Sequence, residues 1–141
     1  MVFGRRIGID YGQTRIGIAI CDQDGLVATP LTTLKNDKTL FSKLDELVAL
    51  YSPVGFYLGK PIHLSGVEGA TADLVAAFAE RLKSSFDLPV TFIDERLTSS
   101  RSRKLLRKVG KSDREQRGLV DQLAAVAILE LGMQIDKAKN A

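Results

Sequence analysis

The order of apolar runs along this chain constrains its fold more than any other feature of the sequence. Three short β-rich runs come first, at about 5–10, 15–22 and 27–34, separated only by short connections that contain glycine. Connections this short join antiparallel neighbours, because parallel strands need a crossover of a dozen or more residues. The N-terminal part therefore predicts an antiparallel meander of three strands.

The rest of the chain alternates helical and strand patterns. The expected elements are a helix at about 37–51 capped by Asn36 or Asp37, a strand at 54–58, a helix at about 69–86, a strand at 90–94, and two helices at about 98–109 and 119–135. Strand, helix, strand, helix, strand makes two right-handed crossovers, so the last two strands are expected to be parallel. The pattern predicts an α/β fold with a five-stranded mixed sheet flanked by helices.

Size and composition limit the organisation further. The chain has 141 residues, 45% of them hydrophobic, which is enough for one well-buried core, so residues 1–141 are expected to form a single domain. No run approaches a membrane span of roughly 18 apolar residues, and the first residues have no apolar signal region, so a cytoplasmic protein is expected. Its only cysteine, Cys21, is expected in a strand, and with the single His63 there is no zinc-type cluster.

Acidic residues lie where the apolar runs begin or end. Asp10 closes the first run beside a tight turn, Asp94 and Glu95 follow the last run, and Asp121 shares a helical face with Ala125. Unpaired carboxylates are costly to bury, so three of them at one core boundary imply a bound cation. Oxygen ligands select Mg²⁺ or Mn²⁺. Adjacent strand residues face opposite ways, so these residues alone leave open whether Asp94 or Glu95 points inward.

Each acid also has a purely structural interpretation. Asp10 could satisfy backbone N–H groups of its own turn. The cluster Asp94–Arg96 could be a surface ion pair of little energetic value. Asp121, placed at the start of its helix, could be favoured by the positive end of the helix dipole.

Basic residues are concentrated between Arg96 and Arg117. This segment has nine basic residues against two acidic ones, a local charge of +7 in a chain of net charge +3. Such a block suggests a polyanion, and the lack of aromatic residues favours contacts to phosphate over stacking on bases. A solvated helix face is the alternative. The residues expected to bind a nucleic-acid backbone are Arg101, Arg103, Lys104, Arg107, Lys108 and Lys111.

Four motifs in order carry a family resemblance. They are Gly8–Gly12 with Arg15–Ala19, Leu58–Pro61, Asp94–Thr98, and Val120–Ala125 with Ile128–Leu129. Together they resemble the YqgF/RuvX family, bacterial RNase H-like proteins described as Holliday-junction resolvases and as pre-16S ribosomal RNA nucleases. The resemblance implies an RNase H-like fold in which Asp10, Glu95 and Asp121 are the catalytic acids and the metal ligands, and it favours Glu95 over Asp94.

The implied activity is metal-dependent hydrolysis of phosphodiester bonds in structured nucleic acid, most simply maturation of the 5′ end of pre-16S rRNA. Cleavage of branched DNA is the alternative, and a junction resolvase would be expected to work as a homodimer. Arg15 and Arg96 are expected to neutralise phosphate beside the site. Lys60 replaces the leucine usual in the family's Gly-Leu-Pro motif and could meet a phosphate, whereas His63 is expected to be a plain surface residue.

Two other classes of protein remain as alternatives. The segment Gly8–Thr14 also resembles the phosphate-binding hairpin of actin-like ATPases and sugar kinases, but those proteins clamp nucleotide between two lobes and this chain supplies one. A non-catalytic nucleic-acid-binding regulator, for instance of transcription, would carry the basic block without cleaving. The intact acids argue against that class.

Overall fold

The computed structural model of the chain describes residues 4–60, 70–95 and 116–139. Its strands are β1 (Arg6–Tyr11), β2 (Arg15–Cys21), β3 (Ala28–Lys35), β4 (Gly55–Lys60) and β5 (Val90–Asp94). Its helices are α1 (Leu40–Tyr51), α2 (Ala70–Phe86) and α4 (Gln116–Lys139).

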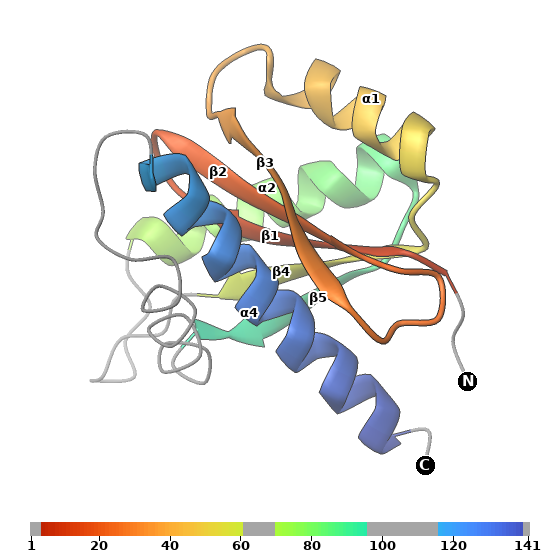
Figure 1. Cartoon of the computed structure of the whole chain (residues 1–141). Coiled ribbons are helices and arrows are strands. Elements are labelled where there is room, and N and C mark those ends of the chain that lie inside the picture. Colours follow the sequence, from red (N-terminus) through yellow and green to blue (C-terminus); the bar gives the residue numbers. More distant parts are fainter. Residues whose placement is uncertain (1–3, 61–69, 96–115, 140–141) are drawn as a thin grey trace.

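The strands form one mixed sheet in the order β3-β2-β1-β4-β5, with β1 at its centre (Figure 1). β1, β2 and β3 pair antiparallel, while β4 lies parallel to β1 and β5 parallel to β4. The short turns between β1, β2 and β3 allow only an antiparallel meander. The helical connections before β4 and β5 return the chain to the opposite end of the sheet, so that these strands can run parallel. This confirms the predicted RNase H-like arrangement.

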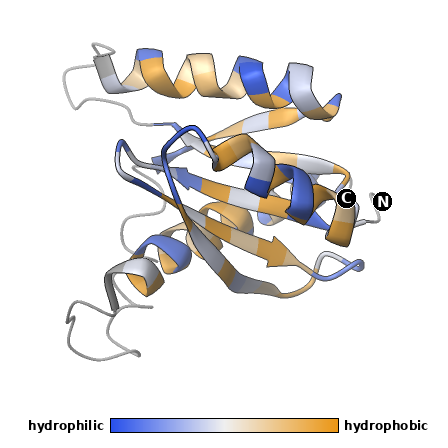
Figure 2. Cartoon of the chain, turned by 90° about the horizontal axis from the view of Figure 1, so that it is seen from above, coloured by the Kyte–Doolittle hydropathy of each residue, from blue (hydrophilic) through white to orange (hydrophobic). Residues whose placement is uncertain are grey.

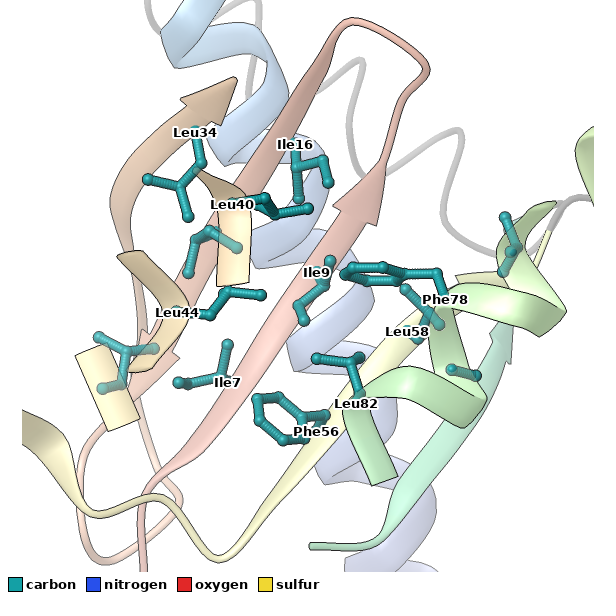
Figure 3. Packing of buried hydrophobic residues seen from close by; sticks show 14 residues of the cluster. Ile7, Ile9, Ile16, Leu34, Leu40, Leu44, Phe56, Leu58, Phe78 and Leu82 are labelled. Carbon is teal, nitrogen blue, oxygen red and sulfur yellow. The ribbon is translucent and has the colours of Figure 1, made fainter. Parts of the chain in front are cut away.

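Helices α1 and α2 cover one face of the sheet. Alternate residues of the central strands, such as Ile7 and Ile9 of β1 and Phe56 of β4, pack there against Leu44 of α1 and Leu82 of α2 (Figure 3). These side chains are almost fully buried. Burial of each large apolar side chain stabilises the fold by about 1.5–3 kcal/mol, so this layer is the main core.

Helix α4 crosses the opposite face (Figure 1). Its buried residues, including Ala125 and Leu129, pack on Ala19 of β2, Tyr57 of β4 and Ile93 of β5. Between Gly118 and Lys139 the helix is long and apolar enough to cross a membrane by length and composition alone. The sheet buries much of that apolar surface, and hydrophilic and hydrophobic colours alternate along the helices in Figure 2, as expected for helices packed on one side.

The C-terminal half of α4 is also held by polar contacts. The Tyr57 hydroxyl donates a hydrogen bond to Asp136, and Arg6 Nε lies 3.9 Å from Asp136 Oδ2. Arg6 is a buried charged residue, and its backbone N–H donates to Cys21 Sγ at 3.1 Å. Burial and the hydrogen bond to Asp136 raise the pKa of Tyr57, which keeps its proton available for that bond. This network ties the end of the helix to β1 and β4.

Some predicted boundaries were wrong. α1 begins at Leu40, and the side chain of its N-cap residue, Thr39, makes no capping hydrogen bond. In the turn before the helix, Asp37 accepts a hydrogen bond from the Thr39 N–H at 2.9 Å. α4 begins at Gln116, so Asp121 lies one turn and a half inside the helix and does not open it. The helix expected at 98–109 and most of the link to Gly118 lie outside the described residues.

Candidate active site

The candidate site lies at the edge of the sheet where the parallel strands β1, β4 and β5 end. Alternation along β1 places Ile7 and Ile9 on the face covered by α1 and α2, so Asp10 lies on the α4 face. Glu95 directly follows β5, two residues after Ile93, which also faces α4. The side chains of Asp10 and Glu95 are joined by a hydrogen bond. The structure therefore brings these two predicted acids together.

The surroundings of the two carboxyl groups disfavour two negative charges. Burial, followed by the charge and hydrogen bond of Glu95 and the charge of Asp121, raises the pKa of Asp10 to about 8. Burial also raises the pKa of Glu95, although its hydrogen bond with Asp10 opposes this. Burial is the largest cause of both shifts, so negative charge on this pair is disfavoured where no positive charge is supplied.

Asp121 approaches the same place from α4. Asp10 pairs with Gly17 across the β1–β2 ladder, and the backbone carbonyl of Asp121 lies directly over Gly17, where any Cβ would overlap it. Asp121 is near enough for its charge to act on Asp10. The predicted inward face is confirmed, since Ala125 and Ile128, on the same helical face, are buried.

The charge partner of Asp121 is a residue that was predicted for another role. Arg15 Nε lies 2.7 Å from Asp121 Oδ2, and the two residues are 106 positions apart in sequence. Within the described ranges, no group of three His, Cys, Asp or Glu side chains is gathered closely enough to hold one metal ion. Sequence patterns missed this ion pair, because only the packing of α4 on β2 brings Arg15 and Asp121 together.

A glycine makes room for Glu95. A Cβ at Gly59 would lie 2.7 Å from Glu95 Oε1 and 2.6 Å from Ile128 Cδ1. Gly59 belongs to β4 and pairs with Ile93, so it faces the same side as the acids. The strand predicted at 54–58 ends one residue before Gly59, and the structure extends it to Lys60.

Lys60, which was predicted to meet a phosphate, does not lie beside the acids. Lys60 Nζ lies 5.5 Å from the centre of the Phe92 ring, and alternation along β4 puts both residues on the sheet face opposite the acids. A phosphate bound at the acids would therefore lie on the other side of the sheet from Lys60. His63, Arg96 and the basic block Arg101, Arg103, Lys104, Arg107, Lys108 and Lys111 lie outside the described residues.

The donor set fits a hard divalent cation. Asp10, Glu95 and Asp121 offer only carboxylate oxygens, the ligands that Mg²⁺ and Mn²⁺ prefer. The raised pKa values of Asp10 and Glu95 mark a position where positive charge is favoured.

Comparison with solved structures supports the fold. The RuvC of Thermus thermophilus in complex with Holliday junction substrate matches with a TM-score of 0.64 and 15% identity, covering 96% of each chain. The yeast mitochondrial Holliday junction resolvase Ydc2 matches with a TM-score of 0.57 and 12% identity, covering 98% of this chain and 82% of that one. At these identities the likeness establishes the RNase H-like fold alone.

Sequence relatives are much nearer. A protein of Cutibacterium acnes is 39% identical over 128 residues, covering 90% of this chain and 80% of that protein. A protein of Streptomyces avermitilis is 38% identical over 140 residues, covering 97% and 90%. Both carry the name "Putative pre-16S rRNA nuclease". The family model RuvX, described as Holliday junction resolvase, matches residues 4–134. This match over most of the chain, together with the two relatives, shows that the chain belongs to the RuvX family of nucleases.

Proposed function

We propose that this protein is a cytoplasmic metal-dependent endonuclease that hydrolyses phosphodiester bonds in structured RNA, with the precursor of 16S rRNA as its substrate. One observation carries the proposal: the hydrogen-bonded Asp10–Glu95 pair at the end of the parallel strands, with Asp121 beside it. The relatives from Cutibacterium acnes and Streptomyces avermitilis support the choice of RNA.

The three acids are proposed as ligands of Mg²⁺ or Mn²⁺. When bound, such an ion supplies Lewis-acid stabilisation to the charge that develops on the phosphate in the transition state. Asp10 lies centrally, at the end of the middle strand, with Glu95 on one side and Asp121 on the other. The protein's own part is to fix these oxygens on a strand, a strand end and a helix, which positions them more accurately than flexible loops would.

Cationic side chains are proposed to hold the nucleic-acid backbone. Arg15 lies at the rim of the site, and its partly exposed side chain is within reach of a phosphate. Arg96 and the basic block would contact phosphates, as the sequence analysis predicts, without reading bases. Such contacts suit a substrate that is recognised by its shape.

The test compares two substrates under identical conditions. Purified protein is incubated with an RNA that contains the precursor 5′ end of 16S rRNA and with a four-way DNA junction, each with Mg²⁺, with Mn²⁺ and with EDTA. The expected result is metal-dependent cleavage of the RNA at a defined site, absent in the Asp10→Asn variant. Binding of both substrates without any cleavage would contradict the proposal and favour a non-catalytic regulator.

Junction cleavage is the second candidate, favoured by the description of the RuvX family model. A resolvase must cut two strands symmetrically, so this activity requires two copies of the chain. The candidate predicts paired nicks in the four-way junction and a dimer in solution, measured by light scattering. A monomer that cuts only the RNA would eliminate it.

A further inference from the structure

The backbone of Asp121 is held firmly on the sheet. The carbonyl of Asp121 sits over Gly17. One turn earlier, the Thr33 hydroxyl donates a hydrogen bond to the carbonyl of Gly118 at 2.5 Å, and Gln122 Nε2 donates to the Thr33 hydroxyl at 3.1 Å. These contacts to β2 and β3 prevent the helix from shifting without losing packing. Any change in what Asp121 binds must therefore come from rotation of its side chain.

The Asp121 carboxylate lies between two possible partners. Arg15 and Gly17 are two residues apart on β2, so both face α4, and the Arg15 guanidinium contacts Asp121 Oδ2 from that side. On the other side lies Asp10, which is paired with Gly17 on the neighbouring strand. The Arg15 side chain is 43% exposed and that of Asp121 only 18%. The arginine can therefore move into solvent, whereas the aspartate stays at the site.

We infer that Arg15 is a displaceable counter-ion, which holds Asp121 away from the Asp10–Glu95 pair until a divalent cation enters and takes its place. The inference rests on the proposed function, because it requires the cation site. In the described part of the chain, the three acids are not gathered closely enough to ligate one ion, and the Asp121 carboxylate is bound by Arg15 instead. A cation among the three carboxylates would repel the guanidinium and compete for the same Asp121 oxygen.

The direction in which cation affinity changes when Arg15 is removed distinguishes two roles for this residue. If Arg15 must be displaced, removing it should tighten cation binding, because the cation no longer breaks an ion pair. If Arg15 instead orients Asp121 for the cation, removing it should weaken binding. A partly exposed ion pair of this kind corresponds to a gain in Mn²⁺ affinity of about threefold to fivefold.

The experiment measures the dissociation constant of Mn²⁺ by isothermal titration calorimetry for the full chain and six variants, of which Asp10→Asn and Glu95→Gln test the cation site itself. Arg15→Gln is the test variant. Lys35→Gln is its matched control, because Lys35 is exposed, lies opposite Arg15 on β3 and carries the same charge. Asp121→Asn, alone and combined with Arg15→Gln, tests the route, since Arg15→Gln should give no gain in affinity when the Asp121 carboxylate is absent. Circular dichroism verifies that each variant is folded.

The outcomes separate this inference from the proposed function. Tighter binding in Arg15→Gln, with little change in Lys35→Gln, supports displacement by the cation. Equal or weaker binding in Arg15→Gln overturns the inference, provided that Asp10→Asn and Glu95→Gln still lower the affinity, and the proposed site then stands. If Asp10→Asn and Glu95→Gln bind Mn²⁺ as well as the unmodified chain does, the cation site itself is wrong.

Discussion

Among single residues, Asp10 links the stability of the metal-free protein to pH. Its pKa is about 8 in the folded protein, against an ordinary value of 3.8, so between these pH values the folded state holds a proton that the unfolded state has lost. The free energy of unfolding should therefore fall as pH rises from about 4 to about 8. Asp10→Asn should remove this loss and be roughly 1–3 kcal/mol more stable than the parent at pH 8 in EDTA.

Urea denaturation from pH 5 to pH 8 in EDTA measures this effect. Asp45→Asn, which removes an exposed acid from α1, serves as the control and should keep the pH dependence of the parent. Parallel stability curves for Asp10→Asn and the parent would show that the pKa of Asp10 is not raised in the folded protein.

Two adjacent acids provide a second residue-level test. Glu95→Gln should lower the rate of cleavage at least about a hundredfold, because an electrostatic contact at the reacting group is lost. Asp94→Asn should cleave at nearly the parental rate, since Asp94 pairs with Lys60 in the β4–β5 ladder on the face away from Asp10. Single-turnover cleavage, together with RNA binding by fluorescence anisotropy, distinguishes lost chemistry from lost binding. Equal losses in both variants would contradict the assignment of Glu95.

Among secondary-structure elements, the contact of α4 with the sheet determines where the acids meet. A methyl group at Gly17 would overlap the backbone of Asp121, whereas one at Gly59 would meet only side-chain atoms of Glu95 and Ile128. Gly17→Ala should therefore destabilise the protein by about 3 kcal/mol or more, and Gly59→Ala by about 1 kcal/mol. Cleavage should fall in both variants, because Gly17→Ala displaces Asp121 and Gly59→Ala displaces the Glu95 carboxylate.

Thermal and urea unfolding of the two glycine variants measure this difference. Gly118→Ala is a suitable comparison, because its added Cβ would meet Thr33 Oγ1 at an ordinary contact distance of 3.4 Å. Equal destabilisation by Gly17→Ala and Gly59→Ala would mean that α4 can shift on the sheet, and the close approach at Gly17 would not position Asp121.

For the whole molecule, the uneven charge predicts how nucleic acid is held. If about five cations of the basic block each neutralise one phosphate, log K should fall against log[salt] with a slope of roughly −3.5 on single strands or −4.5 on duplex. Replacing Arg103, Arg107 and Lys108 by alanine should flatten the slope by about two to three units and weaken all sequences alike. The control replaces Lys38, Lys43 and Lys83, exposed cations of the α1 and α2 regions.

Anisotropy titrations over a range of salt concentrations measure these slopes. A slope unchanged in the Arg103/Arg107/Lys108 variant would make the block a solvated surface. The nucleic acid would then have to be sought beside Arg15, at the rim of the acidic site.

Much of the fold follows from local patterns in the sequence. Short glycine-containing turns allow only an antiparallel meander, and the alternation of helix and strand afterwards requires parallel crossovers, so the topology of all five strands was predictable. The start of α1 was not predictable, because the hydrogen bonds of Asp37 in the preceding turn compete with simple cap rules, and α4 begins three residues before the predicted start.

The candidate site likewise has residues that local patterns predict and contacts that they do not. Asp10 and Asp121 were identifiable because each interrupts an apolar pattern whose period is known. The residues alone left open whether Glu95 or Asp94 points inward, and they did not predict the pairing of Asp121 with Arg15. Both depend on which strands and which helix lie side by side. The sequence by itself determined the order of the elements and the residues that carry charge into the core. Only the tertiary structure decided which charges meet, because contacts between residues as far apart as Arg15 and Asp121 arise from packing and leave no local pattern.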